Sequence, residues 1–67
     1  MIKEVRARVW IEKDSCRIQC LEIPSIKSAK PTKFDAVQDI KNQLFTLKEK
    51  QGIGFELILI ESEKIEI

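Results

Sequence analysis

The chain has 67 residues and a mass of 7.8 kDa, about half the usual domain length, so it forms one domain or part of one. Its net charge of +1 excludes a purely electrostatic case for binding nucleic acid or an anionic membrane. The absence of histidine excludes Ser-His-Asp and Cys-His catalysis and any zinc site with a histidine ligand. A hydrophobic content of 43% is normal for a globular domain and argues against disorder.

Two strands open the chain. Residues 4–12 and 16–21 both alternate between apolar and polar side chains, which predicts strands with one buried face each. The polar break at 13–15 joins them as a hairpin. The inward faces carry Val5, Ala7, Val9 and Ile11 from the first strand and Cys16, Ile18 and Cys20 from the second. The two cysteines lie about 13 Å apart on a straight strand, beyond the reach of a disulfide, so we interpret both as small buried hydrophobes.

The rest of the chain predicts a short strand, a helix and a final strand. Pro24-Ser25 ends the second strand, and residues 26–30 are a short third strand. Thr32 is a good helix N-cap and Gly52 a plausible C′ residue. Between them the apolar residues recur with helical spacing, at Ala36, Val37, Ile40, Leu44 and Leu47.

The stretch 55–60 is the most hydrophobic and predicts an inner strand, which Ile65 and Ile67 extend or follow as a short terminal strand. We therefore expect an α+β domain over residues 1–67, with two layers. One layer is a small, mostly antiparallel sheet, and the other is a single helix on one of its faces.

The face of the sheet away from the helix carries the candidate site. We expect Arg6, Arg8, Trp10, Arg17, Gln19 and Leu21 on it, with Glu56, Ile58 and Ile60 on the same side. Trp and Arg are enriched in the energetic centres of protein interfaces, and a small half-covered sheet needs a second cover. We predict Arg6, Arg8, Trp10 and Leu21 as partner-binding residues, and we expect a homo-oligomer as well. The alternative is an ordinary exposed Trp shielded by arginine stems.

Two other classes of function, an enzyme and a nucleic-acid-binding module, are less consistent with the sequence. The acidic Glu12, Asp14 and Glu22 near the hairpin are interpreted as solvated charges rather than a magnesium or acid-base site, so we expect no enzyme, metal or cofactor. A basic face beside Trp10 suits a small RNA- or single-strand-binding module. Glutamates of the last strand would neutralise those arginines by cross-strand pairing, which argues against direct nucleic-acid binding.

Residues 9–44 resemble the N-terminal domain of HicB-family antitoxins. The segment 21–25, Leu-Glu-Ile-Pro-Ser, looks like the family's xLPG turn with Ser25 where glycine is usual. Residues 32–41 look like its T-x-E-E-A-x-x-x-I-K helix start, where Asp35 is the acid that is kept and Phe34 replaces the other. The residues that match this helix motif are Thr32, Ala36, Ile40 and Lys41.

The resemblance implies a partial ribonuclease-H-like fold without nuclease activity. Family members bind and block a small, basic, RNA-cleaving toxin of the HicA type, and many carry a C-terminal DNA-binding segment, which we do not expect here. The implied function is stoichiometric inhibition by occlusion. Charged residues interrupt the N-terminal segment and the longest apolar run is short, so we expect a cytoplasmic protein without a membrane span. A stand-alone homo-oligomer with no toxin remains the other interpretation.

Overall fold

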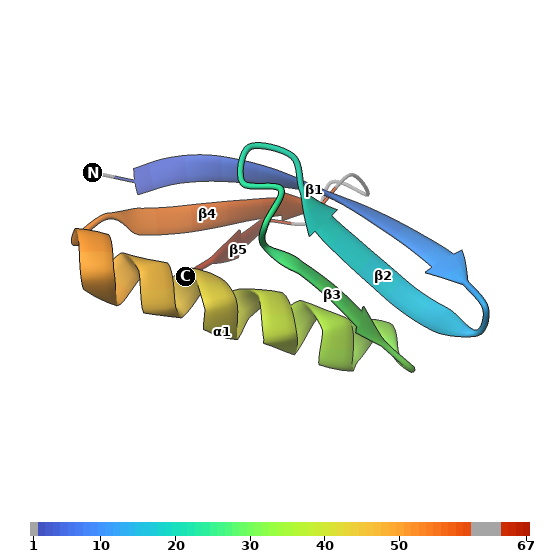
Figure 1. Ribbon diagram of the computed structural model, residues 1–67. Coiled ribbons are helices and arrows are strands. Elements are labelled where there is room, and N and C mark those ends of the chain that lie inside the picture. Colours follow the sequence, from blue (N-terminus) through green and yellow to red (C-terminus); the bar gives the residue numbers. More distant parts are fainter. Residues whose placement is uncertain (1, 60–63) are drawn as a thin grey trace.

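One mixed sheet and one helix make up the part of the chain that the computed structural model describes, residues 2–59 and 64–67. The elements in chain order are β1 (Ile2–Glu12), β2 (Ser15–Cys20), β3 (Lys27–Lys30), α1 (Lys33–Gln51), β4 (Gly54–Leu59) and β5 (Lys64–Glu66). The strand order is β3-β2-β1-β4-β5, with β1 and β4 parallel and the other neighbours antiparallel. Helix α1 lies along one face of this sheet (Figure 1). The predicted two-layer α+β class is confirmed.

The hairpin between β1 and β2 closes with a two-residue turn. Lys13 and Asp14 have φ angles of 51° and 62°, the pair of positive values that a type I′ turn requires. Ser15, expected in the turn, is the first residue of β2 and pairs with Glu12. The twist of this turn matches that of the strands, which explains why a break without glycine still gives a tight hairpin.

Both ends of α1 are capped as the sequence predicts. The Thr32 hydroxyl accepts a hydrogen bond from the Asp35 N–H at 3.2 Å. Gly52, at φ 67°, is in the left-handed region, and its N–H donates to the Lys48 carbonyl at 2.8 Å. These two caps set the helix length, because they satisfy backbone groups that have no partner inside the helix.

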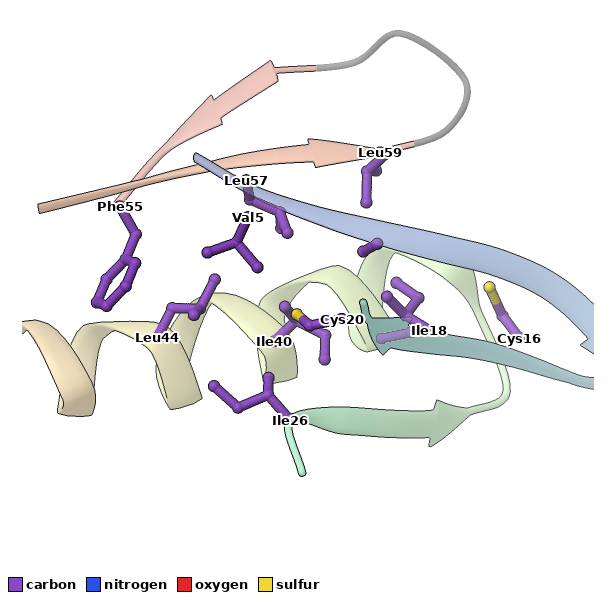
Figure 2. Close-up of a cluster of buried hydrophobic side chains, with 12 residues drawn as sticks. Val5, Cys16, Ile18, Cys20, Ile26, Ile40, Leu44, Phe55, Leu57 and Leu59 are labelled. Carbon is purple, nitrogen blue, oxygen red and sulfur yellow. The ribbon is translucent and has the colours of Figure 1, made fainter. Parts of the chain in front are cut away.

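The core lies between α1 and the sheet (Figure 2). Both cysteines are in it as free thiols, as predicted. Its buried members are Val5, Ala7, Cys16, Ile18, Cys20, Ile26, Ala36, Ile40, Leu44, Phe55, Leu57 and Leu59. Ile11, predicted to be buried, is 73% exposed, and this expectation is wrong. Ile11 does lie opposite the buried Cys16, but the tip of the hairpin extends past the first turn of α1, so the described chain leaves it uncovered (Figure 1).

Polar contacts tie the short strand β3 to the helix. The buried Ser28 hydroxyl donates to the Asp39 carboxylate at 2.7 Å, and the Gln43 side chain donates to the Lys27 carbonyl at 3.0 Å. The predicted third strand is confirmed as β3. Ile26, just before it, and Ser28, within it, both face the core. Without these bonds a four-residue edge strand would have little to hold it against α1.

Strand β4 has the inner position that its apolar sequence predicts, because β1 pairs with one side of it and β5 with the other. The last apolar residues form the separate terminal strand β5, in which Ile65 lies opposite Leu57. Ile60, expected to continue β4, is outside the described residues. Within the described chain, α1 lacks the apolar length needed to cross a bilayer.

Candidate functional site

The open face of the sheet, meaning the face that α1 does not cover, is the candidate site. Strand register decides its members, because residues directly opposite each other on neighbouring strands share a face. Its described residues are Glu4, Arg6, Arg8, Trp10, Arg17, Gln19, Lys27, Ala29, Glu56, Ile58, Lys64 and Glu66. The predicted placement of Arg6, Arg8, Trp10, Arg17, Gln19, Glu56 and Ile58 on one face is confirmed.

Trp10 is half-buried and lies opposite Arg17. The Arg8 guanidinium carbon lies 5.7 Å from the centroid of the indole ring, within cation–π range. The indole N–H donates to the Glu12 carboxylate at 3.3 Å. The ring is therefore oriented by two charged neighbours of its own strand, and part of its surface stays open to a partner.

A hollow of about 420 Å³ lies beside this ring, and we call it the Trp10 hollow. Side chains of β1, β2 and β3 line it, among them Trp10, Arg17, Gln19 and Lys27. The Nε of Arg17 is buried and has no hydrogen-bond partner within the described chain. A buried donor without an acceptor is rare in folded proteins and is usually satisfied by water or a ligand. The hollow itself is lined by the cationic Arg17 next to an aromatic surface, which suits an oxygen acceptor with an apolar neighbour.

The other two predicted contacts, Arg6 and Leu21, meet where β2 ends. The Leu21 N–H donates to the Arg6 carbonyl at 2.7 Å, and the Leu21 side chain is 48% exposed. The Arg6 N–H donates to the Glu22 carboxylate, also at 2.7 Å. The four predicted partner-binding residues therefore lie along β1 and at its junction with the end of β2.

Three glutamates form an acidic row at the other end of the open face. Glu4, Glu56 and Glu66 lie directly opposite one another on β1, β4 and β5. The expectation that the last strand would place glutamates opposite the arginines is wrong for Arg6, because the residue opposite it is Ile58. Like charges directly across a sheet are destabilising, so the row attracts cations to this end of the face. Alternation along β1 predicts that Glu4 lies on the open face. The sequence does not show how β4 and β5 are aligned against β1, so it does not predict that the three glutamates meet.

Other groups with reactive chemistry are engaged or buried. Glu12 and Glu22 accept the hydrogen bonds described above, and Asp14 lies in the turn. Burial raises the pKa of the Cys20 thiol to about 11, and the nearby Glu22 carboxylate adds to the shift. The thiol is therefore protonated at neutral pH and unsuited to nucleophilic chemistry. Among residues 2–59 and 64–67, no three Cys, Asp or Glu side chains are grouped to hold a metal ion.

Comparisons with known proteins add no assignment. No protein-family model, no curated protein and no solved structure matches the chain.

Proposed function

We propose that this domain is a non-enzymatic protein-binding module whose open face is the interface. The observation that carries the proposal is the half-buried Trp10, oriented by charged neighbours beside a hollow that the cationic Arg17 also lines. A Trp flanked by arginines is typical of the energetic centre of an interface. A sheet with its second face uncovered also gains stability from a partner that covers it.

The resemblance to HicB-family antitoxins suggests the class of partner, a small, basic, RNA-cleaving toxin. The open face is divided in a way that suits such a protein. The acidic row of Glu4, Glu56 and Glu66 would attract its cations, while the Trp10 hollow would take an apolar side chain and a carbonyl or carboxylate oxygen. Arg6 and Arg8 have the same sign as a basic partner, so they would contribute orientation rather than attraction. Inhibition would follow from covering the toxin's RNA-binding surface.

A single-stranded nucleic acid is the second candidate, favoured by the basic Arg17 and Lys27 around the same hollow. Two features weigh against it. Arg8 lies over the indole ring, where a base would stack, and the acidic row repels a phosphate chain that continues along the face. The two candidates differ in salt dependence, because binding to phosphates weakens steeply as salt is added.

The test compares single variants of the full chain, expressed with a tag in its native host and isolated at two salt concentrations. We expect a small basic protein to co-elute with the unmodified chain at a fixed ratio and to block RNA cleavage by the purified partner at that ratio. Trp10→Ala should weaken this binding by about 2 kcal/mol, the loss typical of an interface Trp, with circular dichroism unchanged. Glu56→Lys should weaken it through charge reversal.

Lys50→Ala is the matched control, because Lys50 is an exposed cation at the far end of α1 and should leave binding unchanged. Loss of folding in Trp10→Ala would place Trp10 in the structural framework and remove the proposed interface. Recovery of nucleic acid instead, released by moderate salt, would favour the second candidate. A homo-oligomer alone, with neither toxin nor nucleic acid, would contradict the antitoxin proposal and leave self-association as the function of this face.

A further inference from the structure

Strand β1 is longer than either of its neighbours, and one half of one edge is left without a partner. Pairing with β2 covers Ala7 to Glu12, whereas pairing with β4 covers Ile2 to Ala7. The N-terminal half of β1 therefore has β4 on one side only, and Figure 1 shows it continuing past the end of β2. We call the β2-facing edge of Ile2–Val5 the slot.

The backbone groups that point into the slot follow from the alternation of a strand. Arg6 directs its carbonyl and N–H toward β2, where they bond to the Leu21 N–H and the Glu22 carboxylate. Residues two apart on a strand face the same side, so Ile2 and Glu4 direct their N–H and carbonyl groups the same way. Within the described chain these groups have no hydrogen-bond partner. The Glu22 side chain thus satisfies the last N–H before a stretch of open edge.

A second hollow, of about 510 Å³, lies below the slot on the core side of the sheet. Its apolar lining comes from elements that flank the position of the absent strand: Ile23 and Ile26 after β2, Leu47 on α1 and Phe55 on β4. Lys3, Gln43 and Gln51 are also at its surface. A strand added beside β1 would direct every second side chain into this hollow. The same added strand could therefore bond to the unpaired backbone groups of the slot and bury its side chains in the hollow.

We propose that the slot binds an extended peptide segment of another protein by strand addition to β1. The occupant has apolar side chains at alternate positions, which enter the hollow, and a Lys or Arg between them on the opposite face, across from Glu4. Backbone hydrogen bonds supply affinity in this mode of recognition, and the alternate side chains supply selectivity. The slot shares Glu4 with the open face, but its backbone groups and its hollow do not belong to that face, so strand addition does not require the function proposed for the open face.

Charge disfavours a second copy of β1 as the occupant. Two copies pairing antiparallel along this edge keep Ile2 and Glu4 as the hydrogen-bonding positions. The two-fold registers that overlap most within Ile2–Val5 then place Glu4 opposite Glu4 or Lys3 opposite Lys3, and like charges directly opposite are destabilising. A strand with a cation across from Glu4 has no such conflict.

The experiment uses the full chain, labelled for NMR, and the probe peptide acetyl-TVKLRVT-amide. Its valines and leucine alternate with Lys and Arg, and a control peptide has aspartate in place of the leucine. We expect a Kd on the order of 100 µM for the probe and a value at least about tenfold weaker for the control. The amide of Glu4 should exchange with solvent rapidly in the free protein and slowly in the complex.

Glu4→Pro tests the backbone directly. It removes the Glu4 N–H, one of the two that point into the slot and have no partner within the described chain, whereas proline at a β4-facing position would break a bond of the sheet. We expect binding to fall about tenfold with circular dichroism unchanged, and Glu4→Ala to bind within about threefold of the original chain. An unchanged Kd in Glu4→Pro, shifts confined to the surroundings of Trp10, or no shift at about 1 mM probe would each overturn the proposal.

A charge exchange keeps the test valid if Glu4→Pro does not fold. Glu4→Lys retains the N–H but reverses the charge across from the peptide's cations. We expect it to bind acetyl-TVELEVT-amide several-fold more tightly than acetyl-TVKLRVT-amide, the reverse of the original chain's preference. The same order of preference in both proteins would show that the peptide does not lie beside Glu4.

Discussion

The two faces of the sheet are made by the same strands, but they are organised by different forces. On the covered face, residues from β1, β2 and β4 meet α1 and reach zero exposure, as Val5, Ile18 and Leu57 do. On the open face, Trp10 and Ile58 are only half-buried, and their neighbours are charged. The covered face is therefore organised by exclusion of water, whereas the open face is organised by charge and hydrogen bonding. Stability should depend on the first face, and recognition on the second.

The largest contrast should come from two adjacent residues of β4. Leu57→Ala leaves a cavity beneath the helix and should cost about 3 kcal/mol of unfolding free energy, enough to unfold much of a 67-residue domain. Ile58→Ala, on the open face, should cost less than about 1.5 kcal/mol. Urea denaturation of both variants measures the difference, and equal losses would mean that the open face is as well packed as the covered one.

The buried Cys20 thiol makes the covered face sensitive to alkaline pH. Its folded pKa of about 11 is above that of an unfolded thiol, so the unfolded chain loses its proton first. Stability should be unaffected below about pH 8.5 and should fall by roughly 2 kcal/mol as the pH rises to about 11. Cys20→Ala should flatten this part of the pH profile, measured by thermal unfolding in a reductant. Parallel profiles for the two proteins would show that other groups cause the loss.

The polar contact of β3 with α1 should have a smaller effect. Ser28→Ala removes the donor to the Asp39 carboxylate and should cost about 1–2 kcal/mol, because the partly buried acceptor loses its partner. The double variant with Asp39→Asn reports the coupling between the two residues. Strictly additive losses in the cycle would mean that the bond contributes nothing to holding β3.

The smallest effect should be a gain, on the open face. Glu56→Lys converts two repulsive cross-strand pairs, with Glu4 and Glu66, into attractive ones. We expect about 0.5 kcal/mol of stabilisation at low salt, and less at high salt because the charges are screened. A destabilised variant would indicate that Glu56 already has a compensating partner. Stabilisation together with weaker partner binding would sharpen the contrast between the faces.

The architecture was largely readable from local patterns. Period-two alternation placed Val5, Ala7, Ile18 and Cys20 on one face, and Thr32 and Gly52 delimited the helix, because these signals depend only on neighbouring residues. Ile11 was misplaced because alternation gives a face but not the extent of the element that covers it. The type I′ turn was also missed, since Lys13 is not a usual residue for a positive φ angle and Asp14 occupies the position where glycine is preferred.

The candidate site was only half readable. The members of the open face on β1 and β2 followed from alternation within a hairpin, including Arg8 and Trp10. The acidic row could not be predicted in this way. It depends on how β4 and β5 are aligned against β1, and both strands are far from β1 in the sequence. The slot depends on the same information, since it exists only because β2 ends at Cys20, opposite Ala7, and leaves the N-terminal part of β1 unpaired on that side.

By itself, then, the amino-acid sequence determined the positions of the helix and strands, the helix caps, and which side chains of a strand share a face. All of these arise from interactions within a few residues. The tertiary structure alone decided which glutamates meet, where the Trp10 hollow opens and which backbone groups stay unpaired. The physical reason is that strand register across a parallel pair is set by packing against the helix. That packing joins residues that are far apart along the chain.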